Sequence, residues 1–195
     1  MIFKKGERDM KYFKKLVGDR IYLSPRRVED AEKFTEWMND FDITDYIGRS
    51  SQLMSVQGEI EYLEKDSNPE ATFVIVTLNE DKMIGSISLE KMRNIHRTAT
   101  LGIFIGEKEY WSKGYGSEAI KLLLDYGFNY LNLHSINLTV MSFNERAVKC
   151  YKKCGFKEVG RRREDKFVNG AYYDTIIMDI LESEFKESYI RNKNI

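Results

Sequence analysis

The sequence of 195 residues contains little proline, cysteine or histidine, with two residues of each. Because only Pro25 and Pro69 are present and no repeat or Gly-rich linker occurs, one main domain is expected. Cys150 and Cys154 are too few for a disulfide framework and indicate a reducing compartment, so a cytoplasmic location is expected. The histidines lie far from these cysteines in the sequence, and no metal site is expected.

Long apolar runs and an excess of one charge are also missing. No stretch approaches the roughly 18 apolar residues that cross a bilayer, and the charged N-terminus does not read as a secretory signal. The 31 basic and 31 acidic residues cancel, which argues against a nucleic-acid binder. The charges are nevertheless uneven. Residues 1–27 carry nine basic and three acidic groups, whereas residues 29–45 carry seven acidic groups against Lys33 alone.

Hydrophobic periodicity predicts a mixed α/β (α+β) fold. Strands are expected at 20–24, 73–78, 83–90, 99–105, 135–141, 156–167 and 172–181, and helices at 28–39, from Ser55 through Leu63, along Ile120–Leu131 and at 144–153. Asn169-Gly170 predicts a tight hairpin between the last two strands. This order indicates a mainly antiparallel sheet with one parallel step around the long helix, flanked by about four helices.

The chain is therefore divided into an N-terminal extension (1–19), a main domain (20–182) and a C-terminal tail (183–195). The basic segment at residues 1–15 is interpreted as a loosely packed extension, with an amphipathic arm for an acidic surface as the alternative. Arg161-Arg162-Arg163 is interpreted as a solvated strand face, because no set of stacking aromatics surrounds it. Neither a nucleic-acid nor a membrane partner is expected.

The segment Trp111–Ser117 stands between an expected strand and the clearest helix. Gly114 and Gly116 let successive backbone N–H groups converge, and the first helical turn adds unpaired N–H groups and a positive dipole end. These features suit a pyrophosphate, although two glycines alone also fit a simple tight loop. The segment lacks the third glycine of a dinucleotide fingerprint and the Gly-Lys-Ser/Thr of a P-loop.

Together with a later element, this loop resembles the GCN5-related N-acetyltransferase (GNAT) family over Arg20–Leu181. The family pattern N-x-x-A-x-x-x-Y-x-x-x-G-F is met at every stated position from Asn144 to Phe156. Both glycines of the loop pattern Q/R-x-x-G-x-G/A match, but Trp111 stands where Gln or Arg is usual. Tryptophan there resembles the branch of ribosomal-protein N-terminal and spermidine acetyltransferases.

The resemblance implies a sheet splayed at a V-shaped cleft that binds acetyl-CoA, the cosubstrate. One strand edge would take the pantetheine arm, the glycine loop the pyrophosphate, and Asn144 the cofactor arm. The residues thus assigned to the cofactor are Ile103, Phe104, Ile105, Trp111, Ser112, Lys113, Gly114, Tyr115, Gly116, Ser117 and Asn144. Lys113, Lys149 and Lys153 would contact phosphates or simply face solvent.

The implied reaction is direct attack of a primary amine on the thioester in a ternary complex. Tyr151, two helical turns after Asn144, would lie beside the sulfur and protonate the leaving thiolate; the alternative is a core aromatic. Glu90 is a candidate base or an ordinary exposed strand residue, and His96 is interpreted as a surface turn residue.

The acceptor side of the cleft is expected to involve the acidic segment 29–45. Carboxylates there would attract a polyamine, an aminosugar or a protein N-terminal amine, unless they form only a solvated helix face. A non-catalytic acyl-CoA sensor is the alternative function, and a homodimer is one assembly that the sequence allows.

Overall fold

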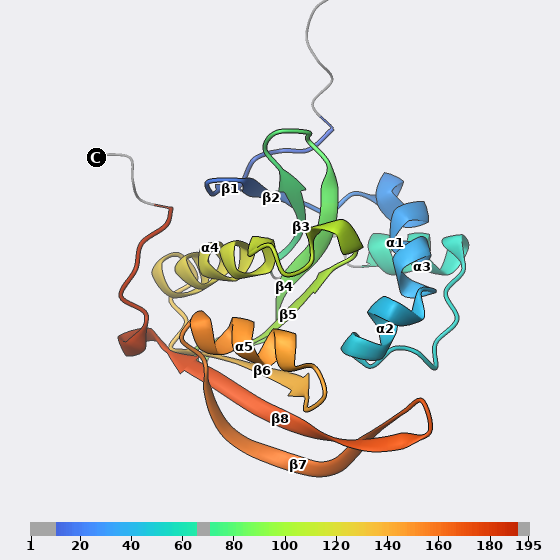
Figure 1. Ribbon diagram of the computed structural model, residues 1–195. Helices are drawn as coiled ribbons and strands as arrows, with labels where there is room; N and C mark the ends of the chain where they lie inside the picture. The colour runs from blue at the N-terminus through green and yellow to red at the C-terminus, as the bar shows by residue number, and fades with distance from the viewer. Residues whose placement is uncertain (1–10, 66–70, 191–195) are drawn as a thin grey trace, which may run out of the picture.

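The computed structural model describes residues 11–65 and 71–190, which form an eight-stranded sheet in the order β1-β2-β3-β4-β5-β6-β8-β7 with helices on both faces (Figure 1). The strands are β1 (Leu16–Val17), β2 (Ile21–Pro25), β3 (Thr72–Thr77), β4 (Met83–Arg93), β5 (Thr98–Ile105), β6 (Ser135–Met141), β7 (Lys157–Val168) and β8 (Ala171–Leu181). The helices are α1 (Ala31–Met38), α2 (Phe41–Ile47), α3 (Val56–Lys65), α4 (Tyr115–Asn129) and α5 (Glu145–Lys153), with 3₁₀ turns at Val28–Asp30, Lys108–Tyr110 and Glu182–Glu184.

Every neighbouring pair of strands is antiparallel except β5 and β6. A parallel pair needs a long crossover, and α4 supplies it by leaving the end of β5 and returning the chain to the start of β6. The predicted mainly antiparallel sheet with one parallel step around the long helix is confirmed.

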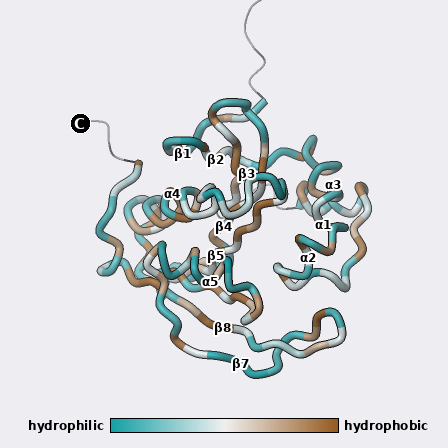
Figure 2. The backbone as a smooth tube through the Cα atoms, in the orientation of Figure 1, coloured by the Kyte–Doolittle hydropathy of each residue, from teal (hydrophilic) through white to brown (hydrophobic). Residues whose placement is uncertain are grey.

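Strands β2 and β3 are buried on both faces, and Figure 2 shows hydrophobic colouring along the central strands of the sheet. Successive residues alternate between two cores, as expected from the two-residue period of a strand. Ile21 and Leu23 pack in the core under α4 and α5, whereas Tyr22 packs with Phe34 and Trp37 under α1 and α3. The sheet thus separates two helical layers.

The described residues contain five α-helices, where about four were expected. The additional helix is α2, which lies in a segment expected to be a connection. Asp40 caps this helix by accepting the Asp42 N–H at 2.9 Å, and Gly48 ends it with a φ of 71°. Its aspartates and threonine favour helix interiors weakly, so only the two end signals identify it. The two-residue strand β1 was also missed.

The hairpin turn predicted at Asn169-Gly170 is confirmed, and side-chain caps begin two of the helices. Asn169 and Gly170 both have positive φ (47° and 80°), as a two-residue hairpin turn requires. Asn144 caps α5 by accepting the Ala147 N–H at 3.2 Å, and the Ser55 hydroxyl accepts the Gly58 N–H at the start of α3.

Both ends of the described chain pack on the domain. Tyr12 and Leu16 are buried, and the buried carboxylate of Asp125 on α4 accepts the backbone N–H of Ile190 at 2.7 Å. The amphipathic-arm and loose-extension interpretations also concern residues 1–10, which lie outside the described residues. The boundaries at 20 and 182 stay predictions.

The close approach of β4 to β5 gives a stability prediction. A Cβ at Gly85 would overlap the carbonyl oxygen of Phe104 and lie 2.9 Å from Ile105 Cα, and neither backbone atom can rotate away. Gly85→Ala is expected to lower the free energy of unfolding by about 2 kcal/mol or more. Gly160→Ala, where a Cβ meets nothing within 4 Å, is the control and should change it by less than about 0.5 kcal/mol. Urea denaturation measures both; equal effects would contradict the overlap.

Candidate active site

The parallel strands β5 and β6 separate after three paired residues. Their register ends at Thr100 opposite Asn137, while β5 continues beside β4 to Ile105 and β6 beside β8 to Met141. The Asn137 side chain fixes the apex, since its Nδ2 donates to the Ala99 carbonyl and its Oδ1 accepts from the Thr100 hydroxyl. The sheet therefore has the predicted V-shaped opening, whose two strand edges expose unpaired backbone groups.

A cleft of about 1450 Å³ occupies this opening. Of the residues predicted to bind the cofactor or catalyse, it is lined by Ile103, Phe104, Ile105, Trp111, Ser112, Lys113, Gly114, Gly116, Ser117, Asn144 and Tyr151. Tyr115 is the exception. Its ring packs against Tyr110 (5.1 Å between centroids) and beneath the Arg20 guanidinium instead.

The glycine loop places the positive end of α4 at the cleft. Gly114 has a φ of 87°, in the left-handed region that favours glycine. Its carbonyl oxygen accepts the first backbone hydrogen bond of the helix, from the Glu118 N–H. The N–H groups of the preceding first turn are the ones that a helix leaves unpaired. A helix N-terminus of this kind attracts anions.

Arg20 and Glu118 hold the loop against β2. The Arg20 guanidinium donates to the Lys113 carbonyl at 2.9 Å and to Glu118 Oε2 at 2.9 Å. Glu118 Oε1 accepts the backbone N–H groups of Arg20 and Ile21. Sequence reasoning missed this pair, which is 98 residues apart; its only signal was an acidic residue in the first turn of a helix.

Trp111 joins the loop to two other elements. Its indole N–H donates to the Ile105 carbonyl at 2.7 Å, and the Arg146 guanidinium of α5 lies 4.2 Å over its ring. Arg146 also lies over the ring of Tyr46 on α2, which meets Trp111 edge-on. Tyr46 was not predicted, because α2 itself was not.

Tyr151 and Asn144 line the cleft from α5. Tyr151 is buried, and burial raises the pKa of its hydroxyl, so the phenol stays protonated at neutral pH. Asn144 is also buried, and its Oδ1 is already used to cap the helix.

The chemistry of the cleft fits coenzyme A. An opened strand edge offers backbone partners to an amide-bearing arm, and the start of α4 offers N–H groups to a diphosphate. The exposed cations Lys113, Arg146, Lys149 and Lys153 line the same end.

Comparison with known proteins identifies the family. The model described as an acetyltransferase (GNAT) domain matches residues 20–157. The chain belongs to the GNAT acetyltransferase family. It is an acetyl-CoA-dependent N-acetyltransferase, and nothing in the comparison supports a non-catalytic sensor.

Relatives of this acetyltransferase cover nearly its whole length. The protein named Probable N-acetyltransferase YjcK of Bacillus subtilis is 33% identical over 87% of this chain and 98% of its own. Spermidine N-acetyltransferase of Vibrio cholerae in complex with CoA and spermine has a TM-score of 0.78 and 32% identity, covering 85% of this chain and 97% of its own. A dodecameric structure of spermidine N-acetyltransferase from V. cholerae has a TM-score of 0.73 and 31% identity, covering 85% and 95%.

The acidic segment of this acetyltransferase lines the cleft, but mainly with apolar side chains such as Phe34, Met38 and Ile43 and not with carboxylates as expected. Of its seven carboxylates only Asp42 lines the cleft, and most are paired within the protein. The pairs are Glu29 with Arg27, Asp30 with Lys11 and Tyr12, Glu36 with Lys33, and Asp40 and Asp42 with Lys108. Residues three or four apart on a helix share a face, and only one face of α1 can point inward.

Other candidates lie as follows. Glu90 lines the cleft, is exposed and accepts a hydrogen bond from the Ser88 hydroxyl at 2.8 Å. His96 lies in an exposed turn, and Arg161–Arg163 are exposed on β7, as predicted.

Within residues 11–65 and 71–190, no cluster of His, Cys, Asp or Glu is placed to hold a metal, and none of the helices there could span a membrane.

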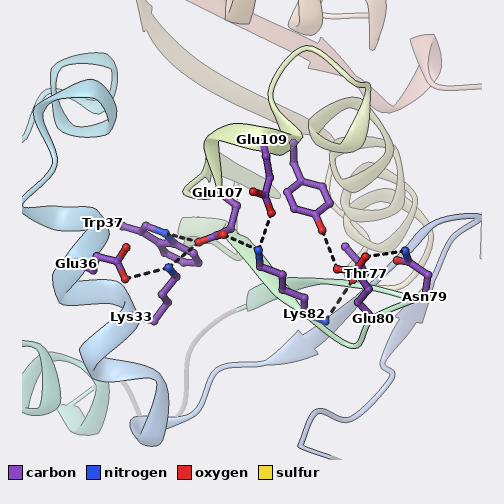
Figure 3. A network of polar contacts seen from close by, with 10 residues as sticks. Lys33, Glu36, Trp37, Thr77, Asn79, Glu80, Lys82, Glu107 and Glu109 are labelled. Carbon is purple, nitrogen blue, oxygen red and sulfur yellow. Dashed lines mark hydrogen bonds and ion pairs between the residues drawn. The ribbon is translucent and has the colours of Figure 1, made fainter.

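A polar network ties α1 to the segment before the glycine loop (Figure 3). Glu107 lies between Lys33 of α1 (2.7 Å) and Lys82 of the β3–β4 turn (2.8 Å), and it accepts the Trp37 indole N–H. Burial by itself would raise the pKa of Glu107, but the hydrogen bonds from both lysines lower it overall.

Glu107→Gln is expected to lower the free energy of unfolding at pH 7 by about 1–3 kcal/mol, because Lys33 and Lys82 each lose their half-buried charged partner and keep only an exposed one. Since the pKa of Glu107 is lowered on folding, its contribution is present above its usual pKa of 4.5 and is lost as the pH falls below that value. The difference between wild type and variant in urea denaturation should shrink over that range. Glu109→Gln, at an exposed position with Lys82 as partner, should change stability by less than about 0.5 kcal/mol.

Proposed function

We propose that this acetyltransferase moves the acetyl group of acetyl-CoA to a primary amine inside the V-shaped cleft. One observation carries the proposal: the opened β5 edge, the start of α4 and the Tyr151 hydroxyl all border a single cleft. In this proposal residues 103–105 pair with the pantetheine arm and the N–H groups of residues 112–117 hold the diphosphate. Trp111 braces that loop, and the Asn144 Nδ2 group donates to the arm. Tyr115 supports the loop through Arg20 without lining the cleft.

Tyr151 is proposed as the general acid. Acetyl-CoA supplies an activated acetyl group whose leaving group is a thiolate. A thiolate leaves more readily when a nearby group protonates it, and the buried, protonated Tyr151 hydroxyl is suited to this task.

Glu90 is proposed as the group that takes the proton from the incoming ammonium, directly or through water. It lies across the cleft on β4, and the Ser88 hydroxyl fixes one of its oxygens. A carboxylate open to solvent can pass the proton on to water.

A polyamine is proposed as the acceptor, with an aminosugar or a protein N-terminal amine as alternatives. Similarity to spermidine N-acetyltransferase of V. cholerae, one structure of which contains CoA and spermine, supports a polyamine. Asp42 and Glu90 line the cleft with exposed carboxylates that an extended cation can contact. The dodecameric relative supports self-association of this chain, with a homodimer as the smallest form. A cytoplasmic location is also proposed, and the two free cysteines are consistent with it.

Tyr151→Phe tests the acid. Removing the hydroxyl is expected to lower kcat about 100-fold or more, while the Kd of acetyl-CoA, measured by calorimetry, changes less than about threefold. Tyr126→Phe, a half-buried tyrosine of α4 packed on Phe73 outside the cleft, is the matched control and should retain its kcat. Loss of acetyl-CoA binding in Tyr151→Phe would contradict the role.

A thiol-release screen tests the acceptor. Spermidine and spermine are expected to give kcat/KM values at least about tenfold above those of aminoglycosides and N-terminal peptides. A higher value for either other class would replace the polyamine. Tight binding of acetyl-CoA without thiol release from any amine would favour the sensor instead.

A further inference from the structure

Two thiols that the proposed reaction does not use lie beside the cleft. Cys150 is on α5 and lines the cleft, and Cys154 is buried at the C-cap of the same helix. Both contact one residue of the first turn of α4. The Cys150 sulfur is 3.2 Å from the Ser117 hydroxyl, and the Cys154 thiol donates to the Ser117 carbonyl at 3.8 Å.

The surroundings of the pair activate one of the thiols. The neighbouring Cys154 thiol lowers the pKa of Cys150 by hydrogen bonding, with further contributions from Ser117, Lys153 and Arg146. The same partnership and burial raise the pKa of Cys154. The pair therefore combines a thiol of lowered pKa that lines the cleft with a buried thiol of raised pKa, as in thiol pairs that react with peroxides.

The spacing permits a bond between them. Four residues along a helix rise about 6 Å, which falls within the Cα separation of disulfides, but their Cβ atoms lie about 5–6 Å apart, so the last turn must tighten to bring them to the roughly 3.5–4.5 Å that a disulfide needs. Cys154 is the helix cap and precedes Gly155, whose φ is 99°, so the final turn need not stay helical to bring the sulfurs together.

We propose that Cys150 and Cys154 form a redox-modification site at which a hydroperoxide generates a disulfide that slows acetyl transfer. The Cys150 thiolate attacks the peroxide oxygen, giving a sulfenic acid and releasing hydroxide. The Cys154 thiol then attacks the sulfenic sulfur, giving the disulfide and water. Two electrons pass from the two thiols to the peroxide.

The disulfide acts on the reaction through the turn that it closes. Tyr151 lies within this turn, and both sulfurs contact Ser117 at the start of α4, so a bond between them alters the contacts between α5 and α4. The inference therefore rests on the proposed roles of Tyr151 and of the α4 start. A shift of about 1 Å in a catalytic group can cost about 100-fold in rate, so a loss of at least about tenfold is expected.

The experiment treats the full-length protein with a small excess of hydrogen peroxide and follows mass, thiol release and acetyl-CoA binding. Trypsin cleaves after Lys149, Lys152 and Lys153, so the disulfide appears as peptide 150–152 joined to peptide 154–157. The expected result is this linked peptide, a loss of thiol release of at least about tenfold, and recovery with dithiothreitol.

Single variants are the controls. Cys150→Ser keeps an oxygen donor beside Ser117 and should have the same rate with and without peroxide. Cys154→Ser should form a Cys150 sulfenic acid and no linked peptide. Absence of the linked peptide from the wild type, or a linked peptide with an unchanged rate, would overturn the proposal. If the reduced protein releases no thiol with any amine, the proposed function fails, and that outcome is separate from the peptide result.

Discussion

The separation of β5 from β6 after Thr100 is the constraint on which the rest of the molecule depends. The N–H and C=O groups of a buried strand edge must form hydrogen bonds. A sheet opened at its centre leaves such groups unpaired, and an extended ligand can pair with them. Asn137 of β6 sets where the opening begins, because its amide bonds to two successive residues of β5, Ala99 and Thr100, at the last parallel pair. The glycine loop and the start of α4 follow β5 directly in the chain, and they line the same opening.

The balanced charge of the chain agrees with this arrangement. An anion can be held largely by backbone N–H groups and a helix dipole, so no overall excess of basic residues is needed. The strongly acidic segment is mostly neutralised within the fold: Lys108, Lys33 and Lys11 each pair with one or more of its carboxylates. The excess of acidic residues in this segment of the sequence therefore does not give the cleft a strongly negative wall.

The sequence signals that succeeded were local. The glycine loop, the Asn144 cap and the Asn169-Gly170 hairpin each depend on residues within a few positions, and the structure contains all three elements. Most residues of the two motifs also line the cleft. What could not be predicted depends on contacts between distant residues. Arg20 reaches Glu118 across 98 positions, and the only local signal of the pair is an acidic residue in the first turn of α4, which does not identify its partner.

The wall of the cleft shows why such contacts matter. Trp111 follows β5, Arg146 lies in the first turn of α5 and Tyr46 in the last turn of α2, yet one guanidinium lies over both rings. A stacked cation gains about 0.5–2 kcal/mol from each favourable ring and loses it when either ring moves. Arg146 therefore couples the position of α2, on the acceptor side, to that of the glycine loop. A glutamine at position 111 could not make this contact, which gives the unusual tryptophan a physical role in joining the two sides of the cleft.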